Sequence, residues 1–360
     1  MTINTTLKNE QPLVYIIILN WNGWKDTIEC IDSIIQQEYL NYRIILIDNC
    51  STDDSIIKIH EWAEGIITSQ SLYGKFPEKE AAINILKLTE SEIEKQTLKN
   101  ENTEIVLIQT GENLGFAKGS NIGIKYALNN HADYVFLLNN DTYVFNKSIT
   151  ELIDYLENNN NYIAATSQIR YYNNEIIWHC GGNITWFYFR KYLFPDIRIN
   201  HVPNEGYSDI SFVSGCAMML PAKKLKTFGL LTEKFFFGEE DFEFALRAKR
   251  QDLKMACIYS SIILHKVSSS IKKISGDRFS INSAFHYYLC RFINVKHNSI
   301  KLFWFCWSAI CLMYIFYFLL KKRISISRIF HFNTKLFYYS WKYNSVNKEL
   351  FNKIMSDMKF

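Results

Sequence analysis

The sequence lacks the glycine-rich signatures of the commonest nucleotide-binding folds. Its 360 residues contain no Gly-x-Gly-x-x-Gly motif after an apolar run and no Gly-x-x-x-x-Gly-Lys-Ser/Thr motif. The first motif brings the backbone close to a dinucleotide, and the second surrounds the phosphates of a nucleoside triphosphate. Their absence argues against a dinucleotide oxidoreductase and a P-loop NTPase. The N-terminal region also lacks a Gly-rich loop followed by an Arg, which would have suggested a sugar nucleotidyltransferase.

Closely paired cysteines and long N-terminal apolar runs are also missing, and prolines are few. The eight cysteines are irregularly spaced without a Cys-x-x-Cys pair, and no secretory segment precedes them. We therefore expect reduced thiols in a cytosolic domain. The five prolines and 21% charged residues accompany 48% hydrophobic residues, which is typical of a folded chain. The apolar run 14–19 is too short for a signal peptide and predicts a buried strand.

Positive charge is concentrated near the C-terminus. The formal net charge is +4, but residues 296–360 hold eleven Lys and Arg against only Glu349 and Asp357. The remaining residues are therefore acidic on balance. A basic tail can meet nucleic acid or anionic lipid. The charge-free run 302–320 within it favours lipid, and we expect no nucleic-acid partner.

Apolar runs alternate with stretches of helical spacing over the first 140 residues. The apolar runs are nearly continuous in Ile, Val and Leu, as in strands that are covered on both faces. This alternation predicts an α/β fold in which a Rossmann-like mixed, mostly parallel sheet is flanked by helices. We expect strands at residues 14–19, 43–47, 105–108 and 134–138, and helices at residues 27–37, 55–64 and 117–130.

The chain divides into two regions. We expect a catalytic domain over residues 13–290 and a basic, aromatic-rich C-terminal tail over residues 291–360, which is helical and associates with a membrane. Residues 65–103 form a polar insertion in the catalytic domain, with a charged helix expected around residues 78–99. A further helix and strand are expected at residues 240–250 and 255–259.

Short polar side chains follow three of the expected strands. They occur in Asn20–Gly23, Asp48–Asp53 and Asn139–Thr142. In an open α/β sheet the ligand lies beyond the carboxyl ends of the strands, so these residues should meet at one edge. Each segment alone could be a common turn or helix cap. Their concentration at one edge favours a nucleotide site that uses carboxylates and a metal instead of a glycine cradle.

Six stretches carry a resemblance to a known family. They are Ile16–Gly23, Ile45–Asp53, Asn113–Gly123, Leu137–Thr142, Val213–Leu220 and Gly238–Arg247. In this order they resemble the motifs of family 2 glycosyltransferases of the rhamnosyltransferase-like branch. The resemblance implies a glycosyltransferase A fold and an inverting transfer from a nucleotide-diphosphate sugar to a hydroxyl of a glycan or lipid-linked acceptor. Cell-surface polysaccharide synthesis is the setting that it implies.

The resemblance also implies donor-binding residues. Asp48 would contact the nucleotide base or ribose, because a carboxylate accepts hydrogen bonds from ring N–H groups and ribose hydroxyls. Gly115 and Gly119 would let the backbone approach the donor, although they could equally serve helix–strand packing. Arg247 would contact the diphosphate or pair with Glu243 four residues earlier. The other donor-site residues implied are Asn22, Asn49, Asp53, Asn121 and Asn140.

Asp141 and His265 are the candidate metal ligands. Asp141 stands where the family has the last carboxylate of its metal motif, which suits Mg²⁺ or Mn²⁺ shared with phosphate oxygens and water. His265 would add a metal or phosphate contact, or it is a structural histidine.

Glu240 and Asp241 resemble the catalytic Glu-Asp pair of the family. Adjacent helical residues point about 100° apart, so only one of them faces the acceptor. We expect Asp241 to be the base and Glu240 to orient it, with an ordinary acidic helix start as the alternative.

Nineteen residues without a charge, 302–320, lie between Lys301 and the basic run 321–323. A helix of this length could just span a bilayer core of about 30 Å. Basic residues on both flanks give no preferred orientation across a membrane. We therefore expect a peripheral, monotopic helix that binds lipid at the cytoplasmic face of the cell membrane. A single span and a core helix of a small tail domain are the alternatives.

Two other functions are compatible with these patterns. A sugar nucleotidyltransferase could use a similar sheet, and it would release pyrophosphate in place of a nucleoside diphosphate. An inactive, membrane-bound nucleotide-sugar-binding protein is the second possibility. The presence of Asp48, Asp141 and Asp241 argues against that second reading.

Overall fold

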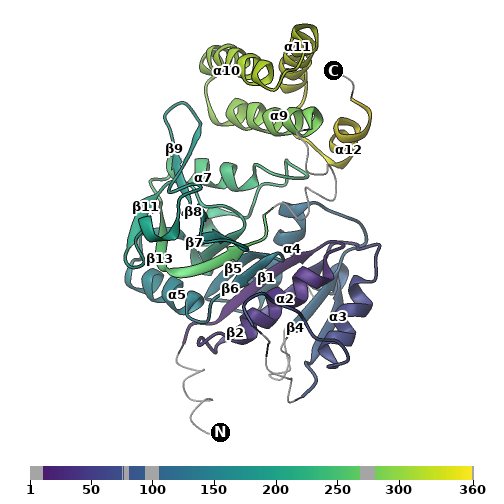
Figure 1. Cartoon of the computed structure of the whole chain (residues 1–360), viewed down its shortest axis with the longest axis vertical. Coiled ribbons are helices and arrows are strands. Elements are labelled where there is room, and N and C mark those ends of the chain that lie inside the picture. The colour runs from purple at the N-terminus through teal and green to yellow at the C-terminus, as the bar shows by residue number, and fades with distance from the viewer. Residues whose placement is uncertain (1–10, 75, 77–80, 94–104, 268–279, 359–360) are drawn as a thin grey trace.

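The computed structural model describes residues 11–74, 76, 81–93, 105–267 and 280–358. In Figure 1 a body built on one large sheet lies beneath a cap of helices that contains the C-terminal residues. The N-terminal end of the described chain lies at the side of the body opposite the cap.

One mixed sheet of eleven strands forms the centre of the body. β1 (Val14–Asn20) runs parallel to β2 (Tyr42–Asp48) on one side and to β5 (Tyr134–Asn139) on the other. Beyond β2 the sheet continues in parallel through β4 (Ile105–Gln109) to β3 (Ile85–Thr89). The predicted mixed, mostly parallel sheet is confirmed. The strands beyond β5 and their neighbours are β6 (Thr142–Val144), β7 (Tyr162–Tyr171), β8 (Ile177–His179), β11 (Tyr207–Ile210), β12 (Ala217–Pro221) and β13 (Lys254–His265).

Helices cover both faces of this sheet, which explains the continuous apolar runs of its strands. Successive residues of a strand point to opposite faces, so Tyr15 and Ile17 of β1 join one hydrophobic core and Ile16 and Ile18 join the other. α4 packs into the first core and α2 into the second. The body helices are α2 (Trp24–Ile35), α3 (Ser55–Ala63), α4 (Phe116–Asn129), α5 (Ser148–Asn158), α6 (Ala222–Phe228) and α7 (Glu240–Arg250).

The prediction of a helix around residues 78–99 is wrong for most of the residues in this range that the structure describes. Residues 85–89 form β3, which extends the sheet beside β4, and a single 3₁₀ turn follows at Glu90–Glu92. The apolar Ile and Leu residues of this segment pair with the open edge of β4, and this tertiary pairing outweighs the local charge pattern. The remainder of the expected helix lies outside the described residues.

The cap has its own hydrophobic core. It consists of α9 (Ile281–Asn298), α10 (Lys301–Lys321), α11 (Ile326–Lys342) and α12 (Lys348–Asp357). Two backbone hydrogen bonds join it to the body: Phe236 N donates to Val346 O at 2.8 Å, and Val346 N donates to Lys234 O at 2.8 Å. A hairpin of β9 (Gly182–Ile184) and β10 (Arg190–Tyr192) rises from the body toward the cap (Figure 1).

Candidate active site

A chain of side-chain hydrogen bonds runs along the edge where β1, β2 and β5 end. Asn20 Nδ2 donates to Asp48 Oδ1 at 2.9 Å, and Thr27 Oγ1 donates to Asn20 Oδ1 at 2.8 Å. Asn140 Nδ2 then donates to Thr27 Oγ1 at 2.9 Å. The strand register explains this grouping, since Asn20 lies directly beside Asp48. The three strand ends therefore form one connected polar edge, as the sequence predicted.

The loops after β1 and β2 are fastened to each other at this edge. The Asp48 carboxylate accepts hydrogen bonds from Ser51 N at 3.1 Å and Ser51 Oγ at 2.6 Å. Asn22 Oδ1 accepts from Thr52 N at 2.7 Å and from Asp53 N at 3.3 Å. Asn22, Asp48 and Asp53 thus lie in one loop cluster. Their predicted contact with the donor nucleotide stays a prediction.

Asn49 and Gly115 shape the neighbouring loop. Asn49 Nδ2 donates to Asn113 Oδ1 at 3.1 Å and to Gly115 O at 3.3 Å, which fixes this loop to the end of β2. Gly115 has a φ of +79°, and a Cβ there would lie 2.0 Å from Phe236 O. Only glycine accommodates this close backbone approach. The need for Gly115 thus arises from contact with the segment before α7.

Gly119, Asn121 and Arg247 face the interior of the fold. A Cβ on Gly119 would lie 2.7 Å from a leucine of β1, so this residue allows α4 to pack closely on the sheet. Buried Asn121 donates to Leu231 O at 2.9 Å and accepts from Leu231 N at 3.1 Å. Arg247 pairs with Glu243 at 3.0 Å and donates to two backbone carbonyls. Gly119 lies near the end of β1, beside Asn49, whereas the side chains of Asn121 and Arg247 are engaged in interior contacts. The donor roles of all three residues stay predictions.

Asp141 and His265 form a buried pair at the other side of the polar edge. Asp141 Oδ1 lies 3.0 Å from His265 Nε2. His265 is the last residue of β13 and pairs with Thr142 of β6, which places it beside Asp141. Burial lowers the pKa of His265, but the adjacent Cys216 and Asp141 raise it by more, to about 10. The imidazolium and the carboxylate therefore stabilise each other, and a metal ion bound here would have to displace the Nε2 proton, because a coordinated imidazole is neutral.

The pair fits a divalent cation that takes only part of its coordination from protein. Carboxylate oxygen and imidazole nitrogen are suitable ligands, and the two donor atoms lie 3.0 Å apart, close enough for one ion to contact both. His265 Nδ1 is buried and has no hydrogen-bond partner in the part of the chain that the structure describes. Within that part, no cluster of three or more His, Cys, Asp or Glu could hold a metal. Phosphate and water would have to supply the other ligands.

Three carboxylates stand at the start of α7. The chain enters the helix through Gly238 and Glu239, whose φ values of 78° and 72° lie in the left-handed region. Asp241 Oδ1 accepts a hydrogen bond from Arg190 Nη2 at 2.9 Å, and Asp241 Oδ2 accepts one from Gly215 N at 3.4 Å. Asp241 is therefore held from two different elements of the body.

The two expected catalytic carboxylates differ in their surroundings. Glu240 Oε2 is buried without a hydrogen-bond partner among the described residues. Burial and the neighbouring Asp241 raise the pKa of Glu240 to about 8. Burial also raises the pKa of Asp241, but Arg190 opposes that rise. Burial thus favours a proton on Glu240 near pH 7, whereas Arg190 favours the ionised form of Asp241.

Gly215 and Cys216 join the two halves of the site. Gly215 N contacts Asp241, and the Cys216 side chain contacts the His265 ring. Successive Cα atoms are only about 3.8 Å apart, so the carboxylates of α7 and the Asp141–His265 pair lie near each other. Neither residue was assigned a role from the sequence, although both lie in the quoted stretch Val213–Leu220. Arg190 lies outside every quoted motif.

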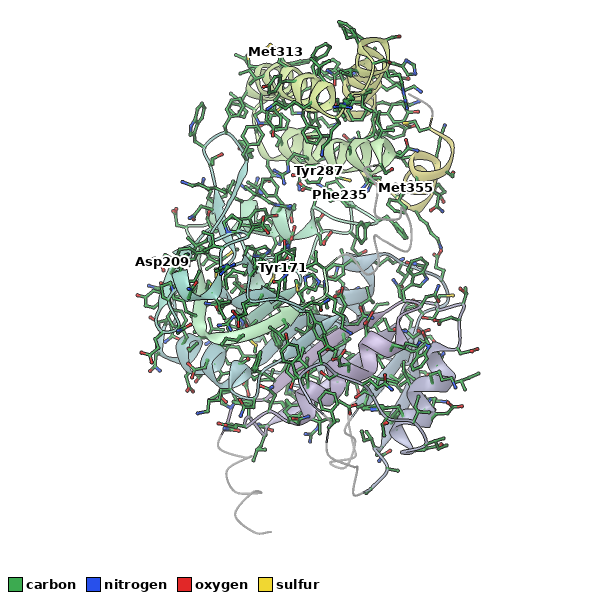
Figure 2. The ribbon with its side chains drawn as sticks, in the orientation of Figure 1. Tyr171, Asp209, Phe235, Tyr287, Met313 and Met355 are labelled. Carbon is green, nitrogen blue, oxygen red and sulfur yellow. The ribbon has the colours of Figure 1, made fainter. Side chains whose placement is uncertain are left out.

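A cavity of about 220 Å³ adjoins Glu240 and Asp241. Its walls come from Arg190 of β10, from the start of α7, from α9 and from α12, so that apolar and aromatic side chains line the cavity beside the charged ones. Figure 2 shows Tyr287 on the side of α9 that faces the body, and Met355 on α12 beside it. The C-terminal cap therefore contributes directly to the space in front of the carboxylates. Other lining residues include Phe237, Ser283, His286, Cys290 and Phe351.

Comparison with known proteins places this geometry in a family. The family described as glycosyl transferase family 2 matches residues 15–78 and 89–228, more than half of the chain. The dTDP-rhamnosyl transferase RfbF of Shigella flexneri is 27% identical over 212 residues, which cover 57% of this chain and 69% of RfbF.

Two solved structures match most of the chain. The crystal structure of GalNAc-T7 with UDP, GalNAc and Mn²⁺ matches 79% of this chain with a TM-score of 0.54 at 16% identity. This chain spans 48% of the length of that protein. The mannosyltransferase PcManGT from Pyrobaculum calidifontis, in complex with GDP-Man and Mn²⁺, matches 81% of this chain and 64% of its own, with a TM-score of 0.48 at 12% identity. The predicted glycosyltransferase A fold is confirmed, and the chain belongs to glycosyl transferase family 2, where it is similar to rhamnosyltransferases.

Proposed function

We propose that the protein transfers a sugar from a nucleotide-diphosphate sugar to a hydroxyl of a glycan or lipid-linked acceptor, with inversion, in cell-surface polysaccharide synthesis. The observation that supports this proposal is the junction at Gly215 and Cys216, where the Asp241 carboxylate and the Asp141–His265 pair approach each other. A donor diphosphate at the ligand pair would present its sugar to a hydroxyl at Asp241. The similarity to RfbF makes dTDP-rhamnose the first donor to test.

The described side chains support a single displacement. Asp241 removes the proton of the acceptor hydroxyl, whose oxygen attacks the anomeric carbon as the bond from that carbon to the diphosphate breaks. Asp141 and His265 would hold Mg²⁺ or Mn²⁺, which when bound offsets the negative charge of the leaving diphosphate. Asp48, Asn22 and Asp53 would bind the nucleoside. A neutral Glu240 limits the negative charge that surrounds the base.

The outer face of α10 suits a membrane surface. Among the described residues, α10 alone is long and apolar enough to cross a bilayer. About a third of its most apolar stretch is buried in the cap. Its outward side chains are large and exposed, and Figure 2 shows Met313 at the side of the cap away from the body. Lys301 and Lys321 end the helix, and positive charge attracts anionic lipid. We propose that the cap lies on the cytoplasmic face of the cell membrane as a peripheral element. The exposed residues are Leu302, Phe305, Ile310, Met313, Tyr314, Tyr317 and Leu320.

A panel of nucleotide sugars tests the proposed activity. The full-length protein is incubated with each donor, a divalent cation and lipid-linked or free glycan acceptors, and the released nucleotide is identified. We expect nucleoside diphosphate whose release depends on the acceptor. Pyrophosphate would instead indicate a nucleotidyltransferase, and donor binding without product would indicate an inactive binding protein.

A further inference from the structure

Arg190 of β10 bridges two carboxylates at the start of α7. Its Nη2 atom lies 2.9 Å from Asp241 Oδ1 and 3.1 Å from Glu239 Oε1. The guanidinium carbon also lies 4.6 Å from the ring centre of Phe212 and 5.0 Å from that of Phe242. Two aromatic rings and two carboxylates therefore fix the guanidinium of a largely buried side chain.

The hairpin that carries Arg190 is seated on the cap. Trp307 of α10 donates from Nε1 to Phe187 O at 2.8 Å. Tyr188 donates from its hydroxyl to Asn298 O at 2.9 Å and accepts, through its carbonyl oxygen, from Arg291 Nη1 at 3.0 Å. These bonds hold the tip of the hairpin against α9 and α10. The position of Arg190 at the active site thus depends on helices that follow the family-matched region in the sequence.

The charges around Asp241 identify its counter-ion. Burial lowers the pKa of His286 to about 4, so this histidine is neutral at pH 7. Arg291 is committed to Glu239, with its Nε and Nη2 atoms at 2.6 Å and 2.8 Å from the two carboxylate oxygens. Of the groups that face Asp241, Arg190 is thus the cation that offsets the negative charge of its carboxylate. These groups are Arg190 and Tyr192 of β10, Glu239 and Glu240 at α7, and His286, Tyr287, Cys290 and Arg291 of α9.

We propose that Arg190 is a positioning residue for the transfer reaction: it holds the Asp241 carboxylate in place and ionised, and the cap holds Arg190 there. This inference rests on the proposed function, in which Asp241 is the base. A base must be both deprotonated and within hydrogen-bond reach of the hydroxyl. Arg190 serves both needs through Asp241, because its cation stabilises the carboxylate and its second contact, to Glu239, fixes its own orientation.

The test compares Arg190→Met, Arg190→Lys and a matched control, Lys191→Met, in the full-length protein. Lys191 is the next residue in β10, and its side chain is exposed. We expect Arg190→Met to lower kcat by about 10²-fold, the size of effect produced by a small displacement of a catalytic group, while calorimetric donor affinity stays unchanged. The acid limb of its kcat–pH profile should move to higher pH, because loss of the cation raises the pKa of Asp241. The kcat of Arg190→Lys should lie between those of Arg190→Met and the wild type, and the kcat of Lys191→Met should match that of the wild type.

A second readout does not depend on turnover. Ionised Asp241 would be buried without its cation in Arg190→Met, so the loss of Tm should be larger at pH 8 than at pH 5. A loss of Tm that is equal at both pH values, or a kcat–pH profile whose acid limb does not move, would mean that Arg190 only fills space. Loss of donor binding would instead mean that Arg190 binds the donor. If Arg190→Met does not fold, the pH profile of Arg190→Lys decides between the same outcomes. If the wild type transfers no sugar, the proposed function fails, and the pH dependence of the Tm loss still tests the charge support.

Discussion

Asp141 and His265 come from different strands, yet their Oδ1 and Nε2 atoms lie 3.0 Å apart in the interior. If they share a divalent ion, Asp141→Ala should abolish both transfer and Mn²⁺ binding, since a single protein ligand would remain. Excess EDTA should stop the wild type in the same way. Mn²⁺ binding is measured by electron paramagnetic resonance, which needs no activity. Full activity in EDTA would contradict the metal assignment, and Asp154→Ala on the exposed side of α5 serves as the control.

Asp241→Asn should keep donor affinity and lose about 10²–10⁴-fold in kcat, the usual contribution of a general base. Asparagine preserves the shape and can still accept a hydrogen bond, but it cannot take a proton. Glu240→Gln should be far milder, because Glu240 already carries a proton at pH 7. Calorimetry of donor binding and transfer rates at one metal concentration separate the two variants. An inactive Glu240→Gln beside an active Asp241→Asn would move the base by one residue.

Glu240 also predicts a pH dependence of stability. Its pKa is about 8 in the folded protein and near 4.5 when exposed, so the folded state binds its proton more tightly than the unfolded state. The resulting stabilisation is full below pH 4.5 and is lost as the pH rises toward and through 8. Glu240→Gln removes this ionisation and therefore the associated loss of stability at higher pH. The Tm of the variant minus that of the wild type should increase from pH 5 to pH 8. A Tm difference that stays constant across this range would contradict the raised pKa.

Much of the fold was predictable because its strands are buried on both faces. Val14–Asn20 and Tyr134–Asn139 read as apolar runs that end in amides, and both are parallel strands that meet at the polar edge. The segment Ile85–Thr89 was missed since a short edge strand gains its stability from pairing with β4, a contact with no local sequence signal.

The sequence pointed to candidate site residues that the fold places at strand ends and at the start of a helix, and their roles stay predictions. Asp48, Asp141 and Asp241 are such residues, and their local motifs are specific. Arg190 could not be found in this way, because its role arises from a hairpin and two carboxylates about fifty residues later. The interior contacts of Asn121 likewise depend on a distant loop, and polarity alone does not distinguish a buried structural amide from one that binds a ligand.

The basic end of α10 should anchor the cap to anionic lipid. Each Lys or Arg near such a surface contributes about 1 kcal/mol, so replacing Lys321, Lys322 and Arg323 by Ser should weaken binding to vesicles that contain phosphatidylserine by about 10²-fold. Met313→Glu should also weaken it, because this exposed side chain would enter the apolar boundary. Vesicle flotation measures both effects. Tyr207→Ser, at an exposed position of β11, should float as the wild type does.

Arg291 should link the stability of the cap to that of the active site. It forms a bidentate pair with Glu239, and both side chains are nearly inaccessible to solvent. Removing one partner of a buried ion pair costs about 3–5 kcal/mol when the other charge is left unpaired. Arg190 still lies 3.1 Å from Glu239 Oε1, so the cost here should fall at the lower end of that range. We therefore expect Arg291→Met to lower Tm strongly and to reduce kcat. The double variant Arg291→Met with Glu239→Gln removes both charges and should recover much of the lost Tm, because no unpaired charge remains. Recovery of Tm without recovery of kcat would show that the pair also orients the residues of α7. A double variant that is no more stable than Arg291→Met would show that the packing of the arginine, and not its charge, stabilises this junction.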